Sequence, residues 1–355
     1  YAGGPAQLCS PALSGRVFVE PAVSCAQLGT MTSSSTWREL RHYRAMTRTA
    51  LLFDDLLMHH RTQDGHPECP ERLAAIRKAL DPFKDLIVMR SRKASLDEIA
   101  LCHDPQYVEN VLKLIESGET ELAGGDVSVC EESGYVALHA AGGVIEIVDA
   151  VLIGHVQNAF CAVRPPGHHA RPAAAMGFCI FNNIAIAARH AQRQHGLERL
   201  AIVDWDVHHG NGTEEIFYSD GSVLFFSTHQ WPWYPGTGHA SETGEGKGAG
   251  LTINCPLPAG SGREEILGAF RDRLFPALEN YSPQLLLISA GFDSRAGDPL
   301  GQFRLADQDF ADLTRMLVDF AAGPCGGRVI SLLEGGYNLA GLGAAVKSHV
   351  SQLIG

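Results

Sequence analysis

Short apolar runs alternate with longer helix-like stretches from residue 50 onward. The runs show no alternation of polar and apolar positions, which predicts strands buried on both faces. They cover residues 50–53, 158–163, 199–205, 222–227, 284–290 and 328–333. Helical patterns lie between them at 69–80, 135–152, 181–196 and 310–323. This order predicts an α/β fold, an open and mostly parallel sheet with helices on both faces.

Four of these runs end in loops that are rich in glycine and reactive side chains. RPPGHHA follows 158–163, DVHHGNG follows 199–205, GFDSRAGDP follows 284–290, and EGGYN follows 328–333. In an open parallel sheet the carboxyl ends of the strands share one edge, and ligands bind in the crevice there. The sequence therefore predicts that residues more than a hundred positions apart converge on one pocket.

Composition agrees with a folded chain that buries a substantial core. Apolar residues make up 45% and charged residues 19% of the 355 positions. No internal repeat or low-complexity linker divides the chain after residue 46, so we predict a single domain over 47–355. The formal net charge of -12 argues against direct nucleic-acid binding through phosphate contacts and favours a basic substrate.

Residues 1–46 differ from the rest of the chain. They contain four arginines but only two acidic residues, together with a TSSST run, a composition compatible with a transit peptide. Equally, Met46 opens a plausible start directly before the first strand-like run, so the extension could lie upstream of the native start. Both interpretations remain open.

The cysteines and the apolar runs bear on the compartment. Nine cysteines are scattered without a CxxC pair, which predicts reduced thiols inside the cell, in the cytoplasm unless residues 1–46 direct the chain to an organelle. No stretch reaches the roughly 18 to 20 continuous apolar residues of a membrane-spanning helix. We therefore expect no membrane association, and the oligomeric state is undetermined.

Three side chains at strand ends predict a metal site. Asp206 and His208 are two positions apart in an extended segment, so they project to the same side. Asp293 follows another strand and completes a set with an open position for water, as in catalytic zinc sites. A second ion would need further carboxylates, but Gly210 and Arg295 stand at the natural places. An isolated DxH pair would usually be structural; its combination with the other loops favours one metal ion.

Acid–base groups accompany this set. His168 and His169 are adjacent and point in different directions, so we expect them to have different tasks in proton transfer, although they could be a merely polar loop. Asp204 could accept an N–H from one of them and fix its tautomer. Tyr337, after two glycines, could donate its phenol to an oxyanion, although a tyrosine in this context alone would usually be packing.

Five motifs in this order resemble the histone deacetylase family, and the likeness covers roughly residues 48–355. HPECPERL (66–73) and PGTG (235–238) agree with it. The five motifs are RPPGHHA (164–170), GFCIFNN (177–183), DWDVHHGNG (204–212), SAGFDSRAGDPLG (289–301) and LEGGYN (333–338). The resemblance implies an arginase-like α/β fold, one catalytic Zn²⁺ and hydrolysis of acyl-lysine amides.

Matched positions imply roles for individual residues. The zinc ligands become Asp206, His208 and Asp293, and His169 becomes the base that activates water. His168 becomes an electrostatic partner paired with Asp204. Tyr337 matches the tyrosine that polarises the carbonyl, which implies an active enzyme. Asn211 stands where the best-known nuclear class has an acid, so the chain looks like class II members and should have a shifted His169 pKa.

The resemblance also implies a channel and a structural ion. Phe178 and Tyr234 match the aromatic walls around a lysine stem, and Gly177 would leave room for the stem. Asp126, in a loop before a helix, could grip the substrate backbone. Asp204 and Ser227 match ligands of a structural K⁺.

The substrate remains open between two classes of acylated amine. Leu300 replaces the gatekeeper glutamate of polyamine-specific members, which favours acetyl-lysine in proteins or peptides over acetylpolyamines. Two rival interpretations remain: a small-molecule amidohydrolase with the same chemistry, and a binding module that recognises acyl-lysine without turnover.

Overall fold

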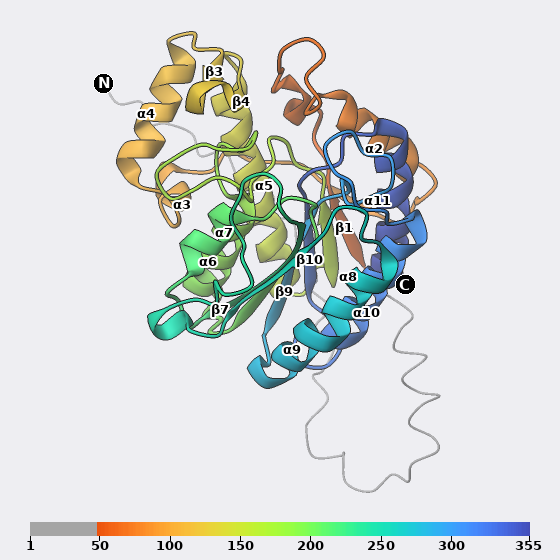
Figure 1. Ribbon diagram of the computed structural model, residues 1–355. Helices are drawn as coiled ribbons and strands as arrows, with labels where there is room; N and C mark the ends of the chain where they lie inside the picture. Colours follow the sequence, from red (N-terminus) through yellow and green to blue (C-terminus); the bar gives the residue numbers. More distant parts are fainter. Residues whose placement is uncertain (1–47) are drawn as a thin grey trace, which may run out of the picture. The chain divides into compact units, whose positions relative to one another are not determined.

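A parallel sheet of eight strands runs through the computed structural model, which describes residues 48–355 (Figure 1). Its spatial order is β2-β1-β5-β10-β9-β6-β7-β8, and every neighbouring pair is parallel. The strands are β1 (Thr49–Leu52), β2 (Ile87–Met89), β5 (Asn158–Cys161), β6 (Leu200–Asp204), β7 (Val223–Gln230), β8 (Thr252–Leu257), β9 (Leu285–Ala290) and β10 (Val329–Leu333).

All six predicted strands are present, and the sheet gains one further strand at each edge. The central strands β5, β6, β9 and β10 are buried at every position, which explains their unbroken apolar sequences. The edge strand β2 has three residues and is only partly buried, while β8 mixes polar residues and a proline into its sequence. Edge strands need no continuous apolar run, so the pattern did not reveal these two.

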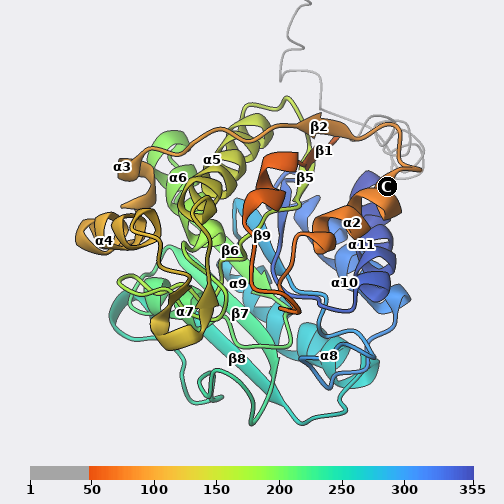
Figure 2. The same cartoon turned by 90° about the horizontal axis from the view of Figure 1, so that it is seen from above.

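Helices cover both faces of the sheet (Figure 2). On one face α5 packs against α6, with α3, α4 and α7 nearby; on the other, α11 packs against α2 and α10, with α8 and α9 alongside. The helices are α2 (Glu71–Leu80), α3 (Leu96–Ile99), α4 (Pro105–Glu116), α5 (Ser133–Leu152), α6 (Asn183–His195), α7 (Asn211–Phe217), α8 (Arg263–Ala269), α9 (Phe275–Tyr281), α10 (Asp307–Ala321) and α11 (Leu339–Ile354). The predicted α/β architecture is confirmed.

Helix ends follow local capping rules. Asn182 caps α6 by accepting a hydrogen bond from the Ala185 amide at 3.0 Å, and Asn338 caps α11 in the same way through Gly341. Gly196 ends α6 in the left-handed conformation, at φ 68°. These caps fix where the loops after β5 and β10 give way to helix.

The helix α5 is long and apolar, and it is the one described helix that could cross a membrane by length and composition. It also carries His139, Glu146 and Asp149, and most of it is buried within the fold. Its apolar character therefore fits a core helix that contacts the sheet on one side and other helices around it.

Two further predictions from the sequence can be compared with the structure. The seven described cysteines are free thiols, as expected. The loop before α5 contains a short antiparallel pair, β3 (Glu121–Leu122) and β4 (Val127–Ser128), with Asp126 immediately before β4. The predicted boundary at residue 46 and the transit peptide lie outside the described residues and stay predictions.

Candidate active site

The loops after the four central strands β5, β10, β9 and β6 meet at one edge of the sheet. Asp204, the last residue of β6, lies beside Ser289 of β9, so the segments that carry Asp206 and Asp293 leave the sheet side by side. Crossover connections place β10 and β9 between β5 and β6. This strand order brings residues 168 and 337 to the same crevice, as the sequence predicted.

The three predicted ligands converge on a buried point. Nδ1 of His208 lies 3.0 Å from Oδ1 of Asp206 and 3.3 Å from Oδ2 of Asp293. Both carboxylates are fully buried, and one ligand atom from each of the three residues lies within 4.8 Å of the others. Oδ2 of Asp293 accepts no well-formed hydrogen bond although it is buried. A buried, unsatisfied carboxylate oxygen is costly unless a cation is near it.

The charges of this group fit a divalent cation. Burial and the charge of Asp206 raise the pKa of Asp293 to about 7. Burial opposes protonation of His208, but the two carboxylates raise its pKa to about 10. The imidazolium form thus compensates two negative charges, and a metal ion would displace its proton because a histidine ligand must be neutral. Two carboxylates and one imidazole form a donor set that suits zinc.

Two glycines make room for these carboxylates. A Cβ atom on Gly335 would lie 1.9 Å from Oδ2 of Asp293, and one on Gly291 would lie 2.0 Å from Oδ2 of Asp206. The Gly335 amide also donates a hydrogen bond to Asp206 at 2.8 Å. The backbone after β10 therefore approaches the ligand oxygens so closely that only glycine fits at position 335.

The adjacent histidines have different partners. Nδ1 of His168 lies 3.0 Å from Asp204, whereas Nδ1 of His169 lies 2.7 Å from the Asn211 side-chain oxygen. Burial opposes protonation of His168, but the charges of Asp204 and two further carboxylates raise its pKa to about 10. Burial lowers the pKa of His169 well below its usual value, and the cations around it act in the same direction. One imidazole is thus held charged and the other neutral, as in pairs that divide acid and base roles.

Glu334 is a site residue that the sequence analysis left without a role. One oxygen of its carboxylate accepts hydrogen bonds from the Gly167 and His168 amides at 2.8 and 3.1 Å, and the other accepts from the Ser289 hydroxyl at 3.0 Å. Burial raises the pKa of Glu334 to about 7. It joins the loops after β5 and β10 and orients His168. Its position in the LEGGYN motif was the available signal.

Tyr337 lines the pocket beside Phe178 and is held through its backbone. Its amide and that of Asn338 donate to Asp298 at 2.7 and 3.2 Å. Arg72 of α2 lies over the phenol ring at 4.9 Å and donates to the carbonyls of Gly336 and Glu334. Burial raises the pKa of Tyr337, which keeps the phenol protonated as a hydrogen-bond donor. Sequence reasoning missed both Asp298 and Arg72.

The pocket lined by His169 has a volume of about 260 Å³, slightly below the roughly 300–1,000 Å³ typical of small-molecule sites. Its walls include the predicted Phe178, Tyr234 and Leu300. Its remaining lining residues are Asp126, His169, Gly177, His208, Trp233, Pro299 and Tyr337. Trp233, which sequence reasoning missed, donates its indole N–H to the Leu300 carbonyl at 2.9 Å and fixes this rim.

Two predicted substrate contacts look different in the structure. A Cβ on Gly177 would lie 2.3 Å from the His169 ring, so the glycine first of all accommodates this imidazole rather than a substrate stem. Asp126 already accepts hydrogen bonds through Oδ2 from the Gly177 amide at 2.6 Å and the Tyr234 hydroxyl at 2.8 Å. It therefore braces the pocket wall, and only Oδ1 is left for a role in gripping a substrate.

The predicted potassium ligands are neighbours. Asp204 and Ser227 are paired in register on β6 and β7, and the Ser227 hydroxyl lies 2.9 Å from Nδ1 of His229. Asp204 also accepts from the Asp206 amide at 3.0 Å, so it serves the metal loop as well as His168. The K⁺ site itself stays a prediction.

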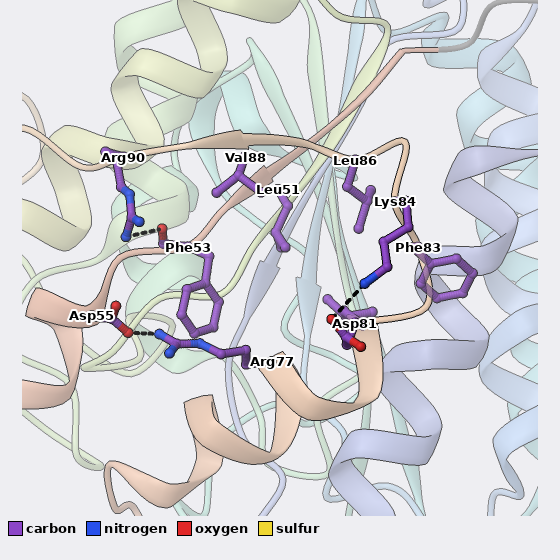
Figure 3. A pocket seen from close by; sticks show the side chains of 11 residues that line it. Leu51, Phe53, Asp55, Arg77, Asp81, Phe83, Lys84, Leu86, Val88 and Arg90 are labelled. Carbon is purple, nitrogen blue, oxygen red and sulfur yellow. Dashed lines mark hydrogen bonds and ion pairs between the residues drawn. The ribbon is translucent and has the colours of Figure 1, made fainter.

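Another hollow, of about 400 Å³, lies where α2 faces β1 and β2 (Figure 3). Leu51, Val88 and other apolar side chains line it. Four of its charged residues form two ion pairs, Arg77 with Asp55 and Lys84 with Asp81, while Arg90 donates to the Phe53 carbonyl. Its lining contains no histidine, cysteine or serine. Its two carboxylates are engaged in ion pairs, and it lacks the histidines that distinguish the crevice around His169.

Comparison with known proteins assigns a family to the chain that carries this set of buried ligands and histidines. Residues 66–353 match the histone deacetylase domain. The chain belongs to the histone deacetylase family. It is a family of deacetylases that is generally zinc-dependent, and the resemblance read from the five motifs is confirmed.

Relatives of this histone deacetylase-family chain have several names. Human "Polyamine deacetylase HDAC10" is 41% identical over 89% of this chain and 48% of its own length. "Histone deacetylase 14, chloroplastic" of Arabidopsis thaliana is 39% identical over 82% of this chain and 74% of its own length. "Histone deacetylase-like amidohydrolase" of Pseudomonas aeruginosa is 38% identical over 82% of each. The chain spans about half the length of the polyamine deacetylases it matches.

A solved structure supports the fold of this family member. The crystal structure of the HDA15 HD domain superposes with a TM-score of 0.83 at 36% identity, covering 87% of this chain and 90% of that one. The arginase- and deacetylase-like α/β fold expected from the motifs is thus confirmed.

Proposed function

We propose that this chain hydrolyses N-acetyl-lysine amides in proteins or peptides with one zinc ion held by Asp206, His208 and Asp293. The observation that carries the proposal is the convergence of these three buried side chains beneath a narrow pocket that also contains His169 and Tyr337. Membership in a deacetylase family supports the reaction class.

The chain's own residues supply the proton transfers. Zinc, when bound, would polarise the amide carbonyl and make a water molecule more acidic. His169 is neutral and accepts the proton of the attacking water, and its hydrogen bond to Asn211 sets the orientation of the ring. Tyr337 donates its phenol to the developing oxyanion. His169 then returns the proton to the amine as the C–N bond breaks, which releases acetate and free lysine.

His168 and Asp204 affect the charge state of neighbouring groups rather than contacting the substrate. His168 is charged, lies 4.0 Å from Asp206, and hydrogen-bonds to Asp204. Its positive charge lowers the pKa of His169 beside it. We infer that the pair keeps the base neutral and helps to neutralise the ligand carboxylates.

The pocket favours a lysine side chain over a polyamine. Phe178 and Tyr234 offer aromatic surface to an aliphatic stem, and Leu300 adds apolar surface at the rim. The net charge of -12 would attract basic peptides without recognising them specifically. Acetylpolyamines are the second candidate, because relatives 41% identical to this chain are named polyamine deacetylases.

One set of assays tests function and substrate together. Zinc-loaded protein is expected to release acetate from acetyl-lysine peptides faster than from acetylated polyamines, and to lose this activity with a chelator. Asp293→Asn should lose the catalytic zinc and turnover together, whereas Tyr337→Phe should keep this zinc while kcat falls by about 10²- to 10³-fold. Full turnover without metal would contradict the proposal.

The same assays separate the rivals. A binding module would retain acetyl-lysine peptides without producing acetate, with or without zinc. For the substrate class, Leu300→Glu should raise kcat/KM for acetylpolyamines relative to acetyl-lysine peptides by about 10-fold, because a carboxylate at the rim attracts the second cation of a polyamine. This factor corresponds to about 1.4 kcal/mol of discrimination between the two substrates. Faster turnover of acetylpolyamines by the unaltered chain would instead favour the second candidate.

We further infer a location and an accessory ion. The composition of residues 1–46 and two relatives named as chloroplastic support organellar targeting, with the cytoplasm as the alternative. Asp204 and Ser227 would hold K⁺ beneath the zinc ligands. Import of a fluorescent fusion into isolated chloroplasts and K⁺-dependent thermal stability would test these two points.

A further inference from the structure

A second group of metal-ligating side chains lies on the helices α5 and α6. Nε2 of His190 and Nε2 of His195, both on α6, each lie 2.7 Å from the same carboxylate oxygen, Oδ1 of Asp149 on α5. The three ligand atoms lie within 4.8 Å of one another. The two imidazoles thus face one point instead of diverging toward solvent.

This cluster lies near the edge of the sheet opposite the catalytic crevice. Asp149 is close to the end of α5, which precedes the start of β5, and His195 is the last residue of α6, which precedes the start of β6. The catalytic residues follow the carboxyl ends of the same strands. The cluster therefore shares no residue with the zinc site around His208.

We propose that Asp149, His190 and His195 bind one divalent transition-metal ion of the zinc class, which clamps α5 to α6. Two imidazole nitrogens and one carboxylate oxygen are donors that zinc prefers. The side chains of Asp149 and His195 are 37% and 20% exposed, so an ion can enter from solvent and keep water on its open side. His190 is 7% exposed and anchors the site in the helix interface.

The donor spacing is close to that of a metal site. Bonds of about 2.0–2.1 Å in tetrahedral geometry separate donor atoms by about 3.3 Å, so each Nε2 would move away from Oδ1 by only about 0.6 Å. His195 lies at the end of α6, followed by Gly196, where a small adjustment of the chain meets little resistance.

In the absence of an ion, two imidazole protons lie between the ring nitrogens and the Asp149 carboxylate. Without an ion, each imidazole donates Nε2–H to Asp149, and these hydrogen bonds lower the pKa of the carboxyl although partial burial opposes this. With an ion, the same nitrogens must present lone pairs, so each neutral ring carries its proton on Nδ1. The two arrangements exclude each other, and added metal decides between them.

Zinc stoichiometry of the full chain is the direct test. Metal-free protein is titrated with Zn²⁺, desalted, and analysed for bound zinc by mass spectrometry. We expect two ions per chain in the unaltered protein and one in Asp149→Asn and in His195→Ala. His155→Ala, which removes an exposed histidine outside the cluster, is the matched control and should keep two.

A second measurement isolates this site from the catalytic one. Asp293→Asn, which lacks a catalytic ligand, should still bind one zinc, and Zn²⁺ should raise its melting temperature by several degrees because the ion binds only the folded state. The double variant Asp293→Asn/His195→Ala should show no such shift. Retained turnover in zinc-loaded Asp149→Asn and His195→Ala shows that both variants fold.

Each outcome bears on the proposal in one direction. One zinc per unaltered chain that is retained in Asp149→Asn and His195→Ala, or two in both of these variants, would overturn it. Loss of one ion in His155→Ala alone would assign the extra zinc to adventitious surface binding and would likewise overturn it. A failed catalytic site, by contrast, shows itself as inactivity of the unaltered protein while the Asp149-dependent ion is still bound.

Discussion

At the scale of single residues, neighbours determine what chemically identical side chains do. His168 and His169 are adjacent in sequence, but an aspartate faces one and an asparagine amide faces the other. Burial acts against the charged form of both, and only His168 has carboxylates that outweigh it. The glycines that contact Asp206 and Asp293 also have a specific role, since the absence of a side chain leaves room for the ligand oxygens.

The first prediction concerns Gly335. Gly335→Ala places a methyl group where Oδ2 of Asp293 now lies, so the carboxylate has to turn away from its shared point with His208. Because changes beside a metal ligand typically cost 10- to 100-fold, we expect zinc affinity to fall by about that factor, with turnover falling in parallel. A competition assay against a chromophoric chelator measures the affinity.

Gly268→Ala is the control for this substitution. Gly268 lies in α8, and a Cβ added there would meet no atom within 4 Å. This variant should keep both affinity and turnover. Unchanged zinc affinity in Gly335→Ala would show that the loop after β10 does not constrain the ligands.

At the scale of elements, α2 supports a loop that is distant from it in sequence. Arg72 is fully buried, pairs with Glu68 at 3.1 Å, and donates to the carbonyls of Gly336 and Glu334 at 2.8 and 2.5 Å. Arg164, after β5, donates to the same Glu68 carboxylate. Burial opposes ionisation of Glu68, but Arg164, His60 and Arg72 lower its pKa to about 2. A buried ionic group thus joins α2 to the loops after β5 and β10.

The second prediction follows from this group. Arg72→Met removes hydrogen bonds from two carbonyls and one cation from Glu68, so the free energy of unfolding should fall by about 3 kcal/mol. Tyr337 loses the support of its loop, so kcat should fall more than KM changes. Urea unfolding and steady-state kinetics on a peptide substrate measure the two effects.

Arg77→Met on the same helix is the matched control. Arg77 is 51% exposed and pairs with Asp55 at the surface, so its loss should cost less than about 1 kcal/mol and leave kcat unchanged. Equal effects of the two substitutions would refute a special role for the buried arginine.

At the scale of the whole molecule, buried histidines make stability depend on pH. His349 lies in the core among Phe160, Trp205 and Phe292, and burial lowers its pKa to about 3. Burial also lowers the pKa values of His60 and His103 to about 4. Such groups take up protons more readily in the unfolded chain, so the folded state loses stability as pH falls below the unfolded pKa of about 6.5.

The third prediction uses His349 to measure this effect. Between pH 7 and pH 5 one such histidine should cost about 2 kcal/mol of folding free energy, because 1.5 pH units lie below its unfolded pKa. His349→Gln should therefore lose about 2 kcal/mol less over this interval than the unaltered protein. Urea unfolding at both pH values measures the difference, and between pH 8 and pH 7 the two proteins should change equally. Parallel losses down to pH 5 would contradict the assignment.

The central strands, four long helices and the inventory of reactive side chains were predictable from local sequence patterns. Continuous apolar runs encode burial on both faces locally, and the motifs after them carry the family's chemistry in their residue types. The spacing of Asp206 and His208 suggested the pair, although these residues lie in a bend after β6, where the His208 amide donates to Oδ1 of Asp206 at 2.9 Å.

Which distant residues meet depends instead on how the elements pack together. The strand order β5-β10-β9-β6 depends on crossover connections that no local pattern specifies, and this order places Glu334, Asp298 and Arg72 around the site. The group of Asp149, His190 and His195 was hidden for the same reason: five positions on a helix turn through about 140°, so nothing in the sequence predicts that both imidazoles face one carboxylate of another helix. Periodicity reports which side of an element is buried, whereas partners across elements are set by how the elements pack.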